Sequence, residues 1–597
     1  MKALFALNKY FWKYRWRLAL GVLFVVISNG FAIYPVQVIR TAFDTVLEAV
    51  KTYSWFDGSS LQGDYFQSLT GILIYFAALV LALALLKGFF LFLTRMTIIV
   101  MSRLIEYDLK NEIFAHYEKL SLSFYKQNNT GDLMNRISED VSRVRMYFGP
   151  AIMYTINLIV LFTLVITTML RVNPLLTLYV LTPLPLLSIS IYYVSHLINK
   201  KSERVQAQLS VLSTFVQESF SGIRVIKAYN QQNHKSEFFE KELEDYKDKT
   251  LSLVKVNAIF LPMMILLIGL STILTIFIGG RLAIAGEITM GNIAEFVIYV
   301  NMLTWPVASL GWVTSLVQRA AASQQRINEF LSVEPDIQNH SETRSDIQGK
   351  ITFDNVAFTY KDSGIEALKE VSFELNPGES LAVMGRTGSG KSTLAGLINR
   401  LYDVEQGEIR IDDRPVKDHH LTDLRHSIGA VPQDVFLFSE TIGNNISFGD
   451  PKGQVPKDRV EWAAKQALVH DNIMGFPEQY ETEVGERGIT LSGGQKQRIS
   501  IARALIAQPS ILIFDDCLSA VDTETEKKIL SNLKKVMKGK TALIITHRVS
   551  AASQCDRVIV LDEGRIVQSG DHDSLMKEEG FYADLYQKQL LEGQEKV

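Results

Sequence analysis

Hydrophobic and polar positions divide the chain into two halves of different character. Up to about residue 320, long apolar runs alternate with charged stretches. Each of six runs is long enough to cross a hydrocarbon core of about 30 Å, which requires about 20 helical residues. We therefore predict an α-helical membrane domain with six spans. The runs lie at about 18–40, 68–98, 148–170, 174–197, 253–280 and 291–318.

The charges between these runs predict how the helices are oriented. The long connections at about 100–146 and 199–250 carry many Lys and Arg residues, which favours the cytoplasmic side. The connection 41–68 is acidic and polar, and the turns 171–173 and 283–292 are short, so we expect these three outside. Basic residues before the first run place the N-terminus in the cytoplasm, and an even number of spans returns the chain there.

The two cytoplasmic connections keep helical periodicity, so we expect their helices to continue beyond the membrane. Each connection contains an interruption, at residues 124–133 and 217–224, where Asn, Gly or Ser residues break the pattern. A short transverse helix or a plain helical hairpin turn would fit either interruption. Composition alone favours the hairpin turn.

The second half has the alternating strands and helices of a soluble α/β protein. We divide the chain into a membrane domain at 1–320, a polar linker at 321–350 and an α/β domain at 351–597. The net charge of −3 gives no reason to expect nucleic acid as a partner. The two cysteines, Cys517 and Cys555, are expected to be reduced and buried rather than joined in a disulfide.

A phosphate-binding loop stands near the start of the α/β domain. Gly385 to Ser392 fits the pattern G-x-x-x-x-G-K-[ST], with a predicted strand before it and a predicted helix after it. Glycines let the backbone N–H groups approach phosphate oxygens, Lys391 adds a positive charge, and the Ser392 hydroxyl suits Mg²⁺. ATP with Mg²⁺ is therefore the predicted ligand. The loop comprises Gly385, Arg386, Thr387, Gly388, Ser389, Gly390, Lys391, Ser392 and Thr393.

A second motif makes a family resemblance specific. Ser492, Gly493, Gly494 and Gln495 follow Leu491 and precede a predicted helix, which resembles the signature of the ATP-binding cassette family. With the phosphate-binding loop and six spans, the whole chain resembles a half-transporter of the exporter class. The resemblance implies the type I exporter fold fused to a P-loop nucleotide-binding domain. It also favours coupling helices at the two interruptions.

The resemblance implies further roles in nucleotide binding and hydrolysis. Each ATP would lie between one subunit's phosphate-binding loop and its partner's signature, so one loop and one signature per chain imply a dimer. The segment 519–522 would communicate across that dimer, and 482–486 would meet the coupling helices. The matching positions are Tyr360 for adenine, where a core tyrosine is the alternative, Gln433 for Mg²⁺ and the attacking water, Asp515 for Mg²⁺, and His547 for the γ-phosphate.

The chain departs from the family pattern after Asp515. Asp516 stands where hydrolytic members of the family carry Glu, so the carboxylate is shorter by one methylene. We expect weak hydrolysis at this site and a heterodimer with a competent partner, as in bacterial exporters with one degenerate site. The alternative is a homodimer in which Asp516 reaches the water.

The predicted function is ATP-driven export of amphiphiles, such as lipids or drugs, across the bacterial inner membrane. N-terminus and nucleotide-binding domain would be cytoplasmic. A regulatory or nucleotide-gated subunit with little hydrolysis is the alternative, whereas six spans argue against a soluble cassette ATPase. Lys87 and Arg95 in the second span either extend toward the cytoplasmic interface or bind an anionic headgroup.

Overall fold

The computed structural model describes residues 2–56, 58–339, 341–451, 453, 455–485, 488, 491–518 and 523–594. Glu486 and the segment 519–522, to which the sequence assigned roles, lie outside the described residues. The chain forms two compact units, and each is described by itself. One unit comprises Met1–His116 and Gly131–Ser332, and the other comprises Tyr117–Thr130 and Val333–Val597.

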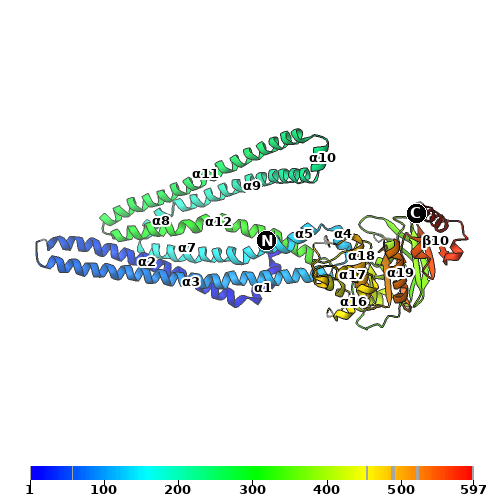
Figure 1. The fold of residues 1–597 in the computed structure, drawn as a ribbon. Helices are drawn as coiled ribbons and strands as arrows, with labels where there is room; N and C mark the ends of the chain where they lie inside the picture. The colour runs from blue at the N-terminus through cyan, green and yellow to red at the C-terminus, as the bar shows by residue number, and fades with distance from the viewer. Residues whose placement is uncertain are drawn as a thin grey trace. The chain divides into compact units, whose positions relative to one another are not determined.

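The first unit is built from long helices that run side by side (Figure 1). Within the described residues, six helical stretches are long and apolar enough to cross a membrane, which confirms the predicted six-span domain. The long helices are α2 (Arg15–Trp55), α3 (Leu61–Lys119), α7 (Ile152–Val172), α9 (Pro183–Ser221), α11 (Gln232–Ile284) and α12 (Met290–Leu331). The eight-residue α8 (Pro174–Leu181) forms one apolar stretch with α9. The short elements of this unit are η1 (Lys2–Leu7), α1 (Asn8–Lys13), α5 (Thr130–Asn135), η2 (Arg136–Asp140), α6 (Val141–Met146), η3 (Tyr147–Ala151) and α10 (Ile223–Ala228). The short helix α4 (Leu122–Gln127) falls in the second unit.

The helices extend well beyond the apolar runs that predicted them. α2 continues to Trp55 and α3 begins at Leu61, so most of the polar connection 41–68 is helical. A helix ends where capping or backbone geometry stops it and not where the lipid ends. Hydropathy therefore located the spans but underestimated the lengths of the helices.

Short helices occupy both interruptions identified from the sequence. α4 ends before Asn128, whose backbone is extended, and α10 follows Gly222 at the end of α9. The structure thus contains the short helices that the family resemblance favoured over plain hairpin turns. α9 and α11 pack along each other, with α10 at the tip of this arm (Figure 1). Val225 and Tyr229 in and beside α10 are 61% and 74% exposed.

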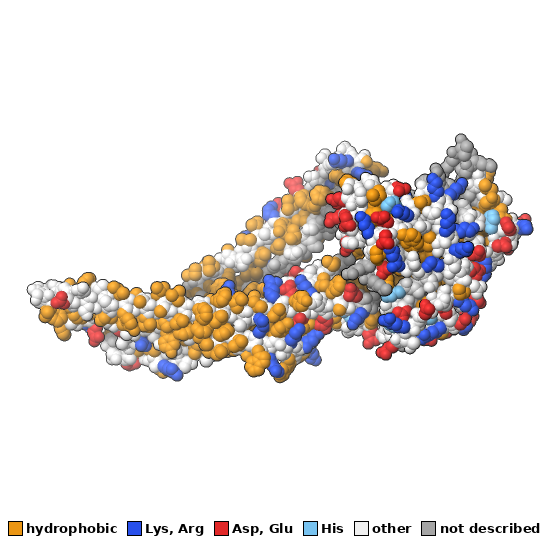
Figure 2. Space-filling view, turned by 60° about the horizontal axis from the view of Figure 1, so that its bottom comes forward, with side chains coloured by type: hydrophobic (Ala, Val, Ile, Leu, Met, Phe, Trp, Pro, Cys, Tyr) orange, Lys and Arg blue, Asp and Glu red, His pale blue; other side chains and the backbone are white. Residues whose placement is uncertain are grey.

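The long helices carry an apolar outer surface. Figure 2 shows hydrophobic side chains gathered along them, and large side chains on α3 are prominently exposed, including Leu81, Leu85 and Phe89. An exposed apolar surface of this extent is stable in lipid and unfavourable in water. The chain is therefore an integral membrane protein.

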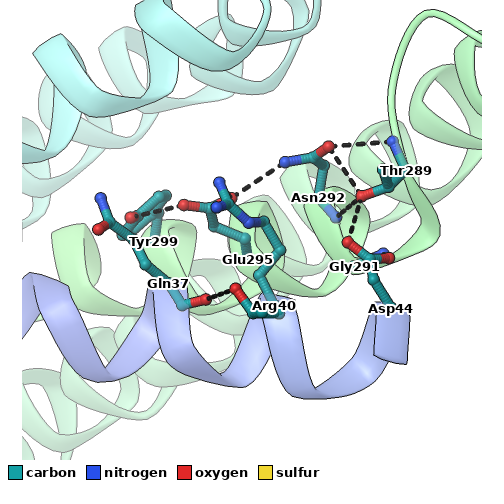
Figure 3. A network of polar contacts seen from close by, with 9 residues as sticks. Gln37, Arg40, Asp44, Thr289, Gly291, Asn292, Glu295 and Tyr299 are labelled. Carbon is teal, nitrogen blue, oxygen red and sulfur yellow. Dashed lines mark hydrogen bonds and ion pairs between the residues drawn. The ribbon is translucent and has the colours of Figure 1, made fainter. Parts of the chain in front are cut away.

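A buried carboxylate joins α2 to α12 within this unit (Figure 3). Glu295 is 0% exposed and accepts a hydrogen bond from the Tyr299 hydroxyl at 2.8 Å. The Arg40 guanidinium lies 3.3 Å from the other carboxylate oxygen, which also accepts from Asn292 Nδ2 at 3.1 Å. The buried charge thus has a counter-charge and two neutral donors.

A second carboxylate of α2 caps the start of α12. Asp44 accepts from the Gly291 N–H at 2.8 Å and from the Thr289 hydroxyl at 2.7 Å (Figure 3). The approach needs glycine, because a Cβ at Gly291 would lie 2.6 Å from Asp44 Oδ1. A negative charge at a helix N-terminus is favourable because the free N–H groups there are positively polarised.

The second unit contains two sheets. The larger has the strand order β10-β9-β3-β8-β7-β6, and β6, β7, β8, β3 and β9 are parallel, whereas β10 is antiparallel. The smaller is antiparallel with the order β2-β1-β4-β5. This α/β domain confirms the fold predicted for the second half. Cys517 and Cys555 are free and buried, as expected.

The core strands of the larger sheet read as continuous apolar runs because helices cover both faces. The strands are β1 (Ile351–Thr359), β2 (Glu366–Leu375), β3 (Ser380–Gly385), β4 (Gln406–Ile411), β5 (Arg414–Pro415), β6 (Ile428–Val431), β7 (Ile511–Asp515), β8 (Thr541–Ile545), β9 (Arg557–Asp562) and β10 (Arg565–Gly570). The helices are α13 (Lys391–Ile398), α14 (Leu421–His426), α15 (Ile442–Ser447), α16 (Lys457–Gln466), α17 (His470–Met474), α18 (Gly493–Leu505), α19 (Thr523–Met537), α20 (Val549–Ala552), α21 (His572–Leu575) and α22 (Phe581–Gln594).

Candidate functional site

One cleft collects residues that follow four neighbouring parallel strands. Because β3, β8, β7 and β6 are parallel neighbours, their carboxyl ends meet at one edge of the sheet, where ligands bind in folds of this kind. The cleft there has a volume of about 300 Å³. Of the residues singled out from the sequence, it is lined by Tyr360, Thr387, Gly388, Gly390, Lys391, Ser392, Thr393, Gln433, Asp515, Asp516 and His547.

The phosphate-binding loop has a backbone that only glycine fits at two positions. Gly385 has φ 143°, and a Cβ there would lie 2.1 Å from the carbonyl oxygen of Leu561. Gly390 has φ 97°, and its Cβ would lie 2.2 Å from the carbonyl oxygen of Ala367. The loop therefore turns tightly into α13 and directs the N–H groups at the start of this helix toward the cleft. Ser389 Oγ is buried and has no hydrogen-bond partner among the described residues.

A lysine and a carboxylate at the base of the cleft are both held by neutral groups. Lys391 Nζ donates to the carbonyl oxygens of Gly385 at 2.9 Å and Arg386 at 2.6 Å. Burial lowers the pKa of Lys391 despite the nearby Asp515 carboxylate. Burial likewise raises the pKa of Asp515, although the Ser392 hydroxyl donates to its carboxylate. An anionic ligand would therefore stabilise the Lys391 ammonium, and a cation would stabilise the Asp515 carboxylate.

The donor set suits Mg²⁺ bound together with a nucleotide. Ser392, Gln433 and Asp515 line the same cleft and offer hydroxyl, amide and carboxylate oxygens. Mg²⁺ keeps several waters and takes only one or two carboxylates when phosphates supply other ligands. Accordingly, no group of three or more His, Cys, Asp or Glu suited to a metal occurs in the described part of the chain. The residues therefore fit ATP with Mg²⁺.

Asp516 stands at the end of β7 in an uncommon conformation. Its φ is 45°, a left-handed backbone that Asp and Asn tolerate better than most residues. Its N–H donates to the carbonyl oxygen of Ile545 at 2.9 Å, and the residue lines the cleft. The strand pattern predicted the position of this carboxylate but gave no sign of its backbone geometry.

Tyr360 forms one wall of the cleft. Its hydroxyl lies 3.1 Å from the Thr393 hydroxyl, and its ring meets Phe358 and Tyr402 edge to face. Beside it lie Ile365 and Ala367 of the β1–β2 region, which the sequence did not single out because they match no motif. The side chain is thus held in place with part of its surface open to the cleft.

His547 follows β8 and is positioned from the C-terminal helix. Gln589 of α22 donates from Nε2 to the His547 carbonyl oxygen at 2.7 Å. The same Gln589 accepts from the Val549 N–H at 3.0 Å, which fixes the turn after β8. Gln589 lies 42 residues from His547, and no local signal in the sequence identified it.

The signature residues lie away from this cleft. Ser492 is the N-cap of α18, and its hydroxyl and the Gln495 side chain form a reciprocal capping box. Ser492 and Gly493 are exposed, so the N-terminus of a 13-residue helix faces solvent. Ser492 and Gly493 do not line the cleft. The other predicted site residues that do not line it are Gly385, Arg386, Ser389, Gly494 and Gln495.

Comparisons with known proteins agree with both halves of this structure. Residues 18–307 match the family described as ABC transporter transmembrane region, and residues 368–519 match the family described as ABC transporter. The chain is 35% identical over 591 residues to the multidrug resistance-like ATP-binding protein MdlA of Escherichia coli, which covers 99% of this chain and 97% of that protein. The chain belongs to the ABC transporter family.

Other relatives of this ABC transporter are consistent with an exporter. It is 35% identical over 479 residues to an ATP-dependent lipid A-core flippase of Pseudomonas fluorescens, covering 80% and 79% of the two chains. A bacterial Atm1-family ABC exporter solved with ATP bound superposes with a TM-score of 0.75, at 26% identity, over 96% of this chain and 98% of that one. The protein is thus an ABC exporter with fused membrane and ATP-binding domains.

Proposed function

We propose that this transporter exports amphiphiles across the bacterial inner membrane by alternating access of a dimer, driven by ATP binding and hydrolysis. The cleft at the edge of the larger sheet carries the proposal, because it gathers an ammonium, hydroxyl, amide and carboxylate groups that suit a nucleoside triphosphate and Mg²⁺. The relatives named for multidrug resistance and lipid A-core export support an amphiphilic substrate. In the proposed topology, N-terminus and ATP-binding domain are cytoplasmic.

Within the cleft, each side chain has a distinct task. Lys391 would leave its two carbonyl partners to neutralise the β- and γ-phosphates, and Tyr360 would stack on adenine. Ser392 and Asp515 would hold Mg²⁺, which neutralises charge that develops on the phosphates. Gln433 would orient the attacking water, and His547 would contact the γ-phosphate.

The position of the signature supports a dimer. Ser492 presents the N-terminus of α18 to solvent and away from the cleft of its own subunit, so it suits the γ-phosphate bound by a partner. The exposed tip around Val225 and Tyr229 supports the same proposal, because an apolar tip of this kind requires a protein partner. We propose that it docks on the ATP-binding domain of the second subunit.

A cavity between α9 and α12 supports an amphiphilic substrate. Its volume is about 380 Å³, and it lies toward the ends of the two spans that the proposed topology places nearest the cytoplasm. Apolar side chains share its wall with hydroxyl, amide and imidazole groups, and no Asp, Glu, Lys or Arg is among the lining residues. A molecule entering from the inner leaflet would meet Ser188, Ser195, His196, Asn199, Thr314 and Gln318.

Transport into inside-out vesicles tests the proposal. ATP-dependent uptake of a fluorescent amphiphile should occur, and Gly311→Leu should reduce it, because a Cβ at Gly311 already lies 3.0 Å from Ser195 Oγ. Gly280→Leu is the matched control, since nothing lies within 4 Å of a Cβ there. ATP binding without uptake of any amphiphile would instead favour a regulatory or nucleotide-gated subunit.

We further propose that the subunit pairs with a different, hydrolytically competent half-transporter. The Asp516 carboxylate reaches about 1.5 Å less far than a Glu carboxylate would at this position. Misplacement of a catalytic group by about 1 Å can slow a reaction on the order of a hundredfold. ATP would then bind at this site and persist while the partner's site turns over. In the homodimer alternative, the backbone around Asp516 lets the shorter side chain reach the water.

A further inference from the structure

A lysine from a membrane-domain connection lies on the ring of Tyr360. Lys126 of α4 places Nζ 4.5 Å from the centre of the Tyr360 ring and 5.2 Å from that of Tyr402. α4 belongs to the same compact unit as the sheet that carries Tyr360. This distance is that of a cation–π contact, and it leaves no room for a nucleobase between the ammonium and the ring.

Tyr360 separates the nucleotide cleft from a second cavity. The second cavity has a volume of about 170 Å³ and is lined by Lys126, Tyr360 and Tyr402, among others. Tyr360 lines both cavities, whereas Lys126 lines only this one and not the cleft that contains Lys391. The ammonium therefore contacts Tyr360 from outside the nucleotide cleft.

Both partners of this contact are held from other directions. Asp336, in the segment after α12, accepts hydrogen bonds from the hydroxyl groups of Ser121 and Ser123 beside and within α4, the first at 3.0 Å. The Tyr360 ring packs edge to face with Phe358 and Tyr402, and its hydroxyl contacts that of Thr393. The positions of α4 and of the Tyr360 ring are therefore both set by contacts outside this pair.

The charge of the ammonium is favoured in this position. Burial alone disfavours it, but contacts with Tyr402 and Tyr360 and the charge of Asp362 outweigh burial and raise the pKa of Lys126. Lys126 is a cation at neutral pH, as a cation–π contact requires.

We propose that Lys126 is a further residue of the nucleotide site, which strengthens adenine stacking on Tyr360 from the opposite face of the ring and so links α4 to nucleotide occupancy. The proposal rests on the proposed role of Tyr360. A cation on one face withdraws electron density from the ring, which makes the other face a better platform for an electron-rich base. By linkage, a bound base strengthens the hold of Tyr360 on Lys126 by the same factor.

Binding measurements on the full-length protein in nanodiscs test this inference. Lys126→Met keeps the length of the side chain without its charge and should weaken ATP binding about two- to fivefold, the range expected for an exposed cation–π contact. Binding of inorganic tripolyphosphate, which has no base, should not change. Lys126→Arg should retain ATP affinity, and Lys119→Met, an exposed lysine seven residues earlier, is the matched control.

A double-mutant cycle with Tyr360→Leu separates this contact from a general effect of charge. In the Tyr360→Leu background, Lys126→Met should no longer change ATP affinity. Additive effects, equal weakening of ATP and tripolyphosphate, or unchanged or tighter ATP binding by Lys126→Met would each overturn the proposal. Unchanged ATP binding by Tyr360→Leu alone would overturn it together with adenine stacking, but would leave ATP-driven export standing.

Discussion

Two buried carboxylates, one in each half of the molecule, have opposite surroundings. Glu295 in the membrane unit has a guanidinium, a phenol and an amide around it, all supplied by the chain itself. Asp515 in the ATP-binding domain has a hydroxyl partner, while the neighbouring Lys391 ammonium donates to backbone carbonyls. The first cluster is electrostatically complete, and the second is arranged around charges that a ligand would balance.

This difference separates a structural cluster from a functional one. A buried ion pair tolerates little change because removal of one partner leaves a charge without compensation. In the cleft, the shifted pKa values of Lys391 and Asp515 mark the strain that nucleotide and Mg²⁺ would relieve. Substitutions in the two regions should therefore have different consequences, with stability affected in one and turnover in the other.

The largest effect is expected from Lys391→Ala. The cleft loses the only ammonium at its base in the described residues, so the phosphates would be held without compensating charge, and ATP binding and turnover at this chain's own site should be abolished. Thermal stability should change little, which sets this region apart from Glu295. ATP binding to, and phosphate release by, the chain alone are the measurements, with the exposed Lys417→Ala as control. Undiminished binding and turnover would contradict the proposed role of Lys391.

Glu295→Ala should produce the reverse pattern. It leaves the buried Tyr299 hydroxyl without its acceptor, which costs about 1–3 kcal/mol of stability, and it removes the counter-charge of the partly exposed Arg40. Unfolding of the purified protein by heat should occur at a clearly lower temperature, whereas ATP binding should be retained. Glu48→Ala on α2, the helix that carries Arg40, is the control because Glu48 is exposed. Equal stability of both variants would show that the cluster around Glu295 does not hold α2 to α12.

Asp516→Glu should raise turnover of the chain's own site, by up to about a hundredfold if reach alone limits the reaction. The longer carboxylate would bring the base within hydrogen-bond distance of the water. ATPase activity is compared for the chain alone and with its proposed partner. Brisk activity of the chain alone that falls on Asp516→Glu would establish Asp516 as the working base and refute the heterodimer proposal.

The double substitution Asp132→Ala, Leu133→Ala should uncouple ATPase activity from transport. Leu133 is buried in α5, and Asp132 pairs with Arg136 at 2.7 Å, so the pair shapes the chain directly after α4. ATP hydrolysis should continue while uptake into vesicles falls. Lys247→Ala, which removes an exposed ion pair with Glu244 on α11, serves as the control. Normal uptake in the double variant would refute the coupling role.

The smallest effect is expected from Lys87→Gln. Lys87 is exposed on α3, where a long side chain can extend toward the membrane interface, so transport of anionic and cationic amphiphiles should be equally unaffected. Uptake of the two substrate classes is measured side by side, with Arg95→Gln as the companion variant. A selective loss of anionic substrate would instead assign Lys87 to headgroup recognition.

Much of the architecture and the cleft followed from the sequence. The spans could be predicted because a helix must stay apolar over the thickness of the membrane. The phosphate-binding loop could be predicted because its backbone needs glycines at fixed spacing between a strand and a helix. The predicted site residues Gln433, Asp515 and His547 could be placed together because each follows a strand of one parallel sheet. Their roles in catalysis and in binding stay predictions.

The tertiary structure alone decided the contacts between distant segments. Three contacts join residues that share no motif and no periodicity: Gln589 with His547, Arg40 with Glu295, and Lys126 with Tyr360. The positions of the helix ends outside the apolar runs also came from the structure alone. Local pattern encodes which face of an element is buried, whereas the partner across that face depends on how whole helices and strands pack. For this reason the sequence identified the residues of the cleft, and only the fold showed that Lys126 of α4 lies against Tyr360 in its wall.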